Sequence, residues 1–243
     1  MARRAKARGA RGKSGARSSW GLRLAALLLL VLLIGGGWGW WHLHHWVPER
    51  SAFPMQGVEI GAADGDVSFA SLKAIGADFA YVDASVSVFA RDPDFVGNFE
   101  KAKAAGMQVG AVHRYDPCQP ADKQAANFVT TVPRDPALLP PAVELDMLAD
   151  DCPVKVTDAK VESELMTFLN QVETHTGKAT VLKITKAFQA RYAVARKLDR
   201  NLWLVEDRVQ PDYAGRPWTM WTANTALANE VSQQGLRWVV VQR

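Results

Sequence analysis

The first 23 residues of this 243-residue sequence contain no acidic side chain, although they hold eight of its 29 lysines and arginines. The rest of the chain carries 21 basic against 25 acidic residues, so the formal net charge of +4 comes entirely from this tail. The tail is rich in Gly, Ala and Ser and directly precedes an apolar run, so the positive-inside rule explains it better than nucleic-acid binding. We therefore predict a basic cytoplasmic tail over residues 1–23 and no nucleic-acid partner.

Residues 24–41 lack charge altogether. As a helix they would rise about 1.5 Å per residue and cover roughly 27 Å, enough to span a hydrocarbon layer. An aromatic belt would meet the headgroups at the end of this span, where Trp38, Trp40 and Trp41 lie, with Trp46 just after it. The short apolar core also suits a cleaved signal peptide, but no clear small-x-small cleavage site precedes the tryptophans. We predict an uncleaved single-pass anchor in the inner (cytoplasmic) membrane, with the domain in the periplasm or outside the cell.

Three histidines follow the anchor, at His42, His44 and His45. Such a cluster can bind a metal, but beside an apolar helix it is more typical of a polar collar at the membrane interface. We therefore predict neither a metal nor a cofactor. The polar, proline-bracketed stretch after them completes a predicted linker over residues 42–56, and the main domain would begin near Gly57.

From Gly57 onward, short apolar runs alternate with helical patterns, and no internal repeat is present. This alternation is typical of strand–helix units around a parallel sheet. The predicted strands span 57–61, 79–83, 109–113, 139–146, 179–184, 202–205, 218–222 and 236–241. The predicted helices span 68–75, 93–105, 121–130 and 158–175, the last with a glycine stop at Gly177. The pattern predicts an α/β barrel over residues 57–243, in which functional side chains lie where strands end.

The sequence has only two cysteines, Cys118 and Cys152. In an exported domain thiols oxidise, and these two follow the third and fourth predicted strands, whose loops should emerge at the same rim. We predict a disulfide between them, with two free thiols as the alternative.

The fourth predicted strand carries two carboxylates two residues apart, Glu144 and Asp146, after the diproline at 140–141. Because side chains alternate along a strand, both should emerge on one face. Like charges held side by side resist joint ionisation, which leaves a proton donor beside a carboxylate, the pair that glycoside hydrolysis needs. The alternative is that both acids merely face water at a strand end.

Several segments occur in the order of one known family. Residues 57–61 (Gly-Val-Glu-Ile-Gly), 78–85, 109–115, 124–128, 139–143 and 218–221 (Trp-Thr-Met-Trp) are each similar to a segment of it. The chain from Gly57 to Arg243 thus resembles the family 25 glycoside hydrolases, lysozymes that cut between N-acetylmuramic acid and N-acetylglucosamine. The resemblance implies an irregular TIM-like barrel, no cofactor, and peptidoglycan glycan strands as the partner.

The departures from the family concern the chemistry. The family pair is Asp-x-Glu, whereas residues 144–146 read Glu-Leu-Asp, so the two acids are exchanged. Glu59 stands at a family Asp position, Val86 at a family Glu position, and Arg237 at another carboxylate position. A cation at 237 would pair with Glu144, Asp146 or Glu59 and hold them ionised, which opposes proton donation.

The resemblance implies a role for each matching residue. Asp146 would donate the proton, with Glu144 and Glu59 supporting the reacting centre. The residues that would contact the sugars are His113, Tyr115, Trp221 and Asp83. The leading hypothesis is a membrane-tethered muramidase of reduced activity. The alternatives are a binding module that retains the glycan groove without turnover, and a structural protein of the envelope.

Overall fold

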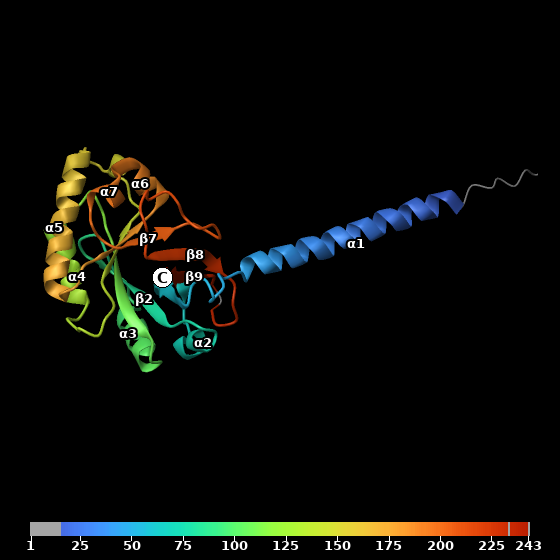
Figure 1. The fold of residues 1–243 in the computed structure, drawn as a ribbon, viewed down its shortest axis with the longest axis horizontal. Helices are drawn as coiled ribbons and strands as arrows, with labels where there is room; N and C mark the ends of the chain where they lie inside the picture. Colours follow the sequence, from blue (N-terminus) through green and yellow to red (C-terminus); the bar gives the residue numbers. More distant parts are fainter. Residues whose placement is uncertain (1–15, 233, 243) are drawn as a thin grey trace, which may run out of the picture. The chain divides into compact units, whose positions relative to one another are not determined.

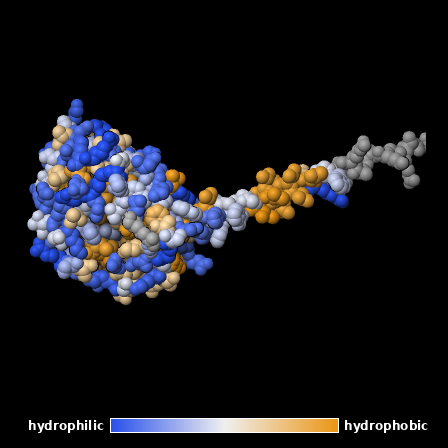
Figure 2. All heavy atoms as spheres, viewed as in Figure 1, coloured by the Kyte–Doolittle hydropathy of each residue, from blue (hydrophilic) through white to orange (hydrophobic). Residues whose placement is uncertain are grey.

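The computed structural model describes residues 16–232 and 234–242. The chain divides into two compact units, Met1–His44 and His45–Arg243. The first unit contains helix α1 (Ala16–His44), in which Trp20–His44 is long and apolar enough to cross a membrane. Apolar side chains gather along the middle of this helix (Figure 2). Of the predicted basic tail, residues 1–15 lie outside the described part of the chain.

Two of the three clustered histidines belong to α1, although the sequence placed them in a linker. His42 stacks on Trp38, with ring centroids 5.4 Å apart, and His44 Nδ1 lies 2.8 Å from the Trp40 carbonyl oxygen. Within each pair the two residues are four positions apart, so each histidine lies about one helical turn after its tryptophan. Within residues 16–232 and 234–242, no group of three or more His, Cys, Asp or Glu side chains is arranged to hold a metal.

Eight strands of the second unit form a closed barrel (Figure 1). Around the barrel the order is β1-β9-β8-β7-β6-β5-β4-β2, and β1 pairs with β2 to close it. Their bounds are β1 Met55–Ile60, β2 Phe79–Val86, β4 Gln108–Arg114, β5 Ala142–Leu145, β6 Val181–Ile184, β7 Leu202–Val205, β8 Met220–Leu227 and β9 Leu236–Val241. Neighbours are parallel except β9, which runs antiparallel to β1 and β8. The predicted barrel is therefore confirmed, and the short strand β3 (Ala90–Arg91), which was not predicted, forms a hairpin with β2.

All four predicted helices are present, as α2 (Phe69–Ala74), α3 (Phe95–Ala104), α4 (Ala121–Thr131) and α5 (Asp158–Thr176). The Thr157 hydroxyl caps the start of α5, and Gly177 ends it in the left-handed conformation, with φ 70°. Helices α4 and α5 pack against each other at one side of the barrel (Figure 1). Two further helices, α6 (Lys186–Tyr192) and α7 (Val194–Lys197), were not predicted, and two short 3-10 turns span Ala62–Asp64 and Ala149–Asp151.

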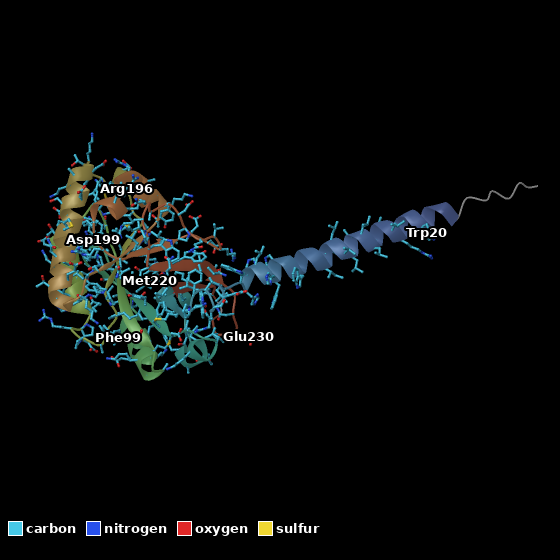
Figure 3. All side chains as sticks on the ribbon, viewed as in Figure 1. Trp20, Phe99, Arg196, Asp199, Met220 and Glu230 are labelled. Atoms are coloured by element: carbon cyan, nitrogen blue, oxygen red, sulfur yellow. A yellow bond between two sulfur atoms is a disulfide. The ribbon has the colours of Figure 1, made fainter. Side chains whose placement is uncertain are left out.

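Side-chain alternation along the strands divides the apolar residues into two layers. One layer, with Val58, Ile60 and Leu182 among its members, packs under the helices and forms the main core. The other fills the barrel interior and includes Tyr81, Trp203 and Met220, the last labelled in Figure 3. The inward positions nearer the carboxyl ends of the strands carry charge instead.

The predicted linker packs on the barrel from His45 onward. Trp46 and Phe53 contact the ring of Trp221, with centroids 6.3 and 5.8 Å away. The Gln56 side chain is buried, donates to the Pro48 carbonyl oxygen at 2.9 Å and accepts from Trp238 Nε1 at 2.8 Å. Because these aromatic side chains bury apolar area against β8, the stretch belongs to the barrel unit.

The predicted disulfide between Cys118 and Cys152 is present, with 5.3 Å between the Cα atoms. The cysteines follow β4 and β5, which pair in parallel, so both loops leave the same rim of the barrel.

Candidate active site

A pocket of about 320 Å³ opens at the carboxyl ends of the parallel strands. Residues of β2, β3, β4, β5 and β9 line it, among them Asp83, Arg114, Glu144 and Arg237. In (β/α) barrels functional side chains are carried at this end because the loops there vary without disturbing the core. The lining is mostly charged, and four of its six charged residues form ion pairs: Asp83, Arg114, Glu144 and Arg237.

A buried lysine joins two of the carboxylates at the floor of the pocket. Lys183 Nζ donates to Glu59 Oε1 and, at 2.7 Å, to Glu144 Oε1, and it lies 5.3 Å from the centre of the Trp203 ring. Lys183 and Glu144 are direct partners on neighbouring strands, and Glu59 is fully buried. Burial alone would raise the pKa of Glu59, but the charges of Arg237 and Lys183 outweigh it and hold that pKa below its ordinary value.

Arg237 forms ion pairs with three acidic side chains. Its Nη1 donates to Glu59 Oε1 at 3.0 Å, and its Nη2 donates to Asp64 Oδ2 at 3.0 Å and to Asp83 Oδ2 at 2.9 Å. Of the three alternative partners expected for Arg237, Glu59 is thus the one it contacts, and Asp64 and Asp83 are two partners that were not expected.

Asp83 differs electrostatically from Glu59. Burial and the neighbouring charge of Glu59 raise the pKa of Asp83 to about 7, although Arg237 and Lys183 oppose this. A Cβ atom on Gly61 would come within 2.3 Å of Asp83 Oδ2, so only glycine at 61 leaves room for this carboxylate. Asp83 therefore exchanges a proton near neutral pH.

Asp146 lies directly after β5 and is held by Arg114 from the next strand. Arg114 Nε donates to both carboxylate oxygens at 3.0 Å, and its Nη2 donates to one of them as well. The sequence predicted that Glu144 and Asp146 would form an acid pair. The structure instead gives each its own cation, Lys183 for Glu144 and Arg114 for Asp146.

Three residues expected to contact sugars are corrected by the structure: His113, Tyr115 and Trp221 are 0%, 0% and 3% exposed. The His113 ring stacks on Phe168 at 4.7 Å, and burial lowers its pKa to about 4, so it is neutral at pH 7. Tyr115 packs against the same phenylalanine, and Trp221 Nε1 donates to a backbone carbonyl oxygen at 2.7 Å. His113 and Trp221 alternate with inward-facing neighbours, so both side chains point outward: His113 against α5, and Trp221 against Trp46 and Phe53. Asp83, the fourth expected contact, does line the pocket.

The sequence reasoning did not assign Lys183, Arg114 or Asp64 to the site. Lys183 gave a usable signal, because it is the one charge in the apolar run Val181–Ile184. A lysine there must find carboxylates, since burying an unpaired charge is very unfavourable. Arg114 is the last residue of β4 and Asp64 lies in a short turn, and neither has a distinguishing sequence pattern.

The sequence match and the fold agree on a family. The family model of glycosyl hydrolases family 25 matches residues 58–226. The chain belongs to this family. Its fold resembles a family 25 glycosyl hydrolase from Bacillus anthracis at 24% identity and TM-score 0.72, covering 82% of this chain and 93% of that one. It also resembles a bacterial lysozyme from Streptomyces coelicolor at 19% identity and TM-score 0.70, covering 77% and 91%.

A family 25 lysozyme from Aspergillus fumigatus has the same fold at 18% identity and TM-score 0.65, with coverage of 78% of this chain and 94% of that one. No curated protein matches the chain. At these identities the similarities concern the barrel itself. The family 25 barrel is therefore retained, while its mouth carries the ion pairs described above.

Proposed function

We propose that this protein binds peptidoglycan glycan strands in the pocket at the barrel mouth, as a membrane-anchored family 25 glycosidase of lysozyme type with strongly reduced turnover. Family membership supports peptidoglycan hydrolysis, because structural relatives are described as lysozymes and muramidases. The observation that carries the reduced turnover is the pairing of each candidate catalytic acid with a cation: Glu59 and Glu144 with Lys183, and Asp146 with Arg114.

The pairing of Asp146 is the part that limits proton donation. A general acid must present a proton to the glycosidic oxygen, and both Asp146 oxygens already accept hydrogen bonds from Arg114. The ion pair must therefore open before this carboxyl group can act. General acid catalysis typically contributes about 10²–10⁴-fold, so we expect turnover to be lower by a factor in that range.

A binding module without any turnover is the second candidate. It is favoured by Arg237, which gives Glu59 a second cation and also pairs with Asp83. The two candidates predict the same binding and differ only in whether residual cleavage is measurable.

The anchor is supported by helix α1. Its leucines are largely exposed, for example 63% at Leu27 and 72% at Leu32. A bilayer would bury such a helix, and its length and composition suit a single span. We place the helix in the inner (cytoplasmic) membrane, uncleaved, with the barrel in the periplasm or outside the cell.

Purified sacculi and the full chain in detergent provide the test. We expect the protein to co-sediment with sacculi and to release muropeptides slowly. Arg114→Gln should raise release because it frees Asp146, and Asp146→Asn should abolish it. The matched control is Arg191→Gln, which removes an arginine that pairs with two surface aspartates outside the pocket.

Co-sedimentation without release from any variant would identify the binding module. Absence of both co-sedimentation and release would contradict both candidates.

A further inference from the structure

The β2–β3 hairpin, which contributes residues to the pocket lining, carries an exposed aromatic side chain. Val86 pairs with Ala90 in this hairpin, and Val86 and Arg91 both line the pocket. Phe89, in the turn between them, is 84% exposed. Single exposed apolar residues are common on proteins, so exposure alone does not make Phe89 a binding residue. The hydrogen bonds that hold its turn and the side chains beside it must decide this.

The hairpin turn is held in a fixed and uncommon conformation. Ser87 has φ 52°, in the left-handed region that residues other than glycine seldom adopt. Its N–H donates to the Arg114 carbonyl oxygen at 3.1 Å, and its hydroxyl donates to Asp116 Oδ2 at 2.8 Å. Asn127 Nδ2, from α4, donates to the carbonyl oxygens of Ser87 and Ala90 at 3.2 and 3.0 Å. The turn that carries Phe89 is thus ordered before any ligand arrives, which lowers the entropic cost of binding.

Arg91 lies in the same hairpin and is held by neutral groups. Its Nε donates to Asn127 Oδ1 at 3.2 Å, and its Nη2 donates to Thr130 Oγ1 at 2.9 Å. Within the described part of the chain, Arg91 forms no ion pair, whereas Arg114 and Arg237, which also line the pocket, are both paired with carboxylates. The positive charge of Arg91 is therefore available to an anionic group of a ligand.

We propose that Phe89 and Arg91 form a sugar subsite at the rim, outside the ion-paired floor of the pocket. Phe89 packs on the apolar face of a pyranose ring, and Arg91 pairs with the carboxylate of an acidic amino sugar. In peptidoglycan this carboxylate is the lactyl group of N-acetylmuramic acid. The subsite rests on the proposed function and specifies which sugar of the strand the hairpin recognises.

Two tetrasaccharides that differ in the carboxylate test the subsite by calorimetric titration of the full chain in detergent. One alternates N-acetylglucosamine with N-acetylmuramic acid and lacks stem peptides, and the other is chitotetraose. The wild type should bind the muramyl ligand about threefold more tightly or better, as expected for a partly exposed ion pair. Phe89→Ala should weaken both ligands by about tenfold, because the ring packs on either sugar.

Arg91→Gln should weaken only the muramyl ligand and so remove the preference, while Arg91→Lys should retain most of it. The matched control is Val96→Ala on α3, another exposed apolar side chain, which should change neither affinity. Thermal unfolding verifies that each variant is folded, and Phe89→Leu, which keeps apolar volume without a ring, replaces Phe89→Ala if that variant unfolds.

Wild-type affinity in Phe89→Ala, or equal weakening of both ligands in Arg91→Gln, would overturn the subsite. Continued binding of those variants to sacculi would leave the proposed function standing. A wild-type protein that binds neither tetrasaccharide nor sacculi would contradict the subsite and the proposed function together.

Discussion

Replacing Lys183 by methionine should destabilise the barrel strongly, and the loss should depend on pH. The lysine is 3% exposed and neutralises Glu59, which is fully buried, together with Glu144. Removing one partner of a buried ion pair costs about 3–5 kcal/mol, because the remaining charge stays buried without compensation. Arg237 still contacts Glu59, so we expect the lower end, about 3 kcal/mol. For a domain of this size, that corresponds to a fall in Tm of about 6–12 °C.

The pH dependence follows from the sign of the Glu59 shift. In the wild type its pKa lies below the ordinary value of 4.5, so ionised Glu59 stabilises the fold above about pH 4.5, and this contribution is lost as the pH falls further. Without Lys183, burial is opposed by one cation fewer and the pKa of Glu59 rises. The difference in stability between Lys183→Met and the wild type should therefore be largest at pH 7 and shrink towards pH 4.

Thermal unfolding followed by circular dichroism at pH 7 and pH 4 measures both effects. Lys101→Met serves as the control, because Lys101 pairs with Asp66 on the surface and should leave Tm unchanged. The reasoning fails if Lys183→Met melts with the wild type at pH 7, or if its deficit is the same at both pH values.

Three further predictions concern other parts of the molecule. Intact-mass analysis should show a two-proton gain on reduction of Cys118–Cys152, and Cys118→Ser with Cys152→Ser should cost roughly 3–4 kcal/mol of stability; an unchanged mass would contradict the bridge. A reporter active only outside the cytoplasm, fused after Arg50, should be active and sediment with membranes, whereas soluble reporter would indicate cleavage. Because the pKa of Asp83 is raised from 3.8 to about 7, stability should fall as the pH rises from about 4 to 7, and Asp83→Asn should flatten this slope in thermal melts; an unchanged slope would exclude Asp83 as its source.

The barrel could be predicted because each strand and each long helix has its own local signal. Short apolar runs and the glycine stop at Gly177 set most element boundaries within a few residues. Helices α6 and α7 were missed because they are short and the break between them falls at Ala193, which takes φ 53°. Neither glycine nor proline marks that break, so the sequence offered no boundary there.

The candidate site was predictable only where a residue carries its own signal. Glu144 and Asp146 stand out because they end an apolar strand. The cations that pair with them lie on other strands, and only the strand register, which the sequence does not give, brings them together. The sequence could not assign His113 to a face of the sheet, because a histidine in an apolar strand can lie on either side. Its neighbour Val112 lies in the barrel interior, so His113 points outward. Strand parity, applied to all eight strands together, would have separated the inward charges from the outward aromatic residues.

The charges of the pocket form a compensated set, which limits what a single reversion can achieve. Glu144 lies between Arg114 and Lys183 in the strand register, and Glu59 lies directly opposite Arg237. A barrel interior can hold such charges only if neighbours cancel, so each substitution depends on the others.

Arg237→Asp, which restores the family's charge, would place a fourth carboxylate beside Glu59, Asp64 and Asp83. We therefore expect this variant to gain no hydrolysis and to lose stability at pH 7, by an amount similar to that of Lys183→Met. Thermal melts should show partial recovery near pH 4, where protonation relieves the repulsion between the carboxylates. A stable Arg237→Asp variant that releases muropeptides faster than the wild type would show that the pocket tolerates an isolated charge reversal, and that Arg237 alone restrains the enzyme.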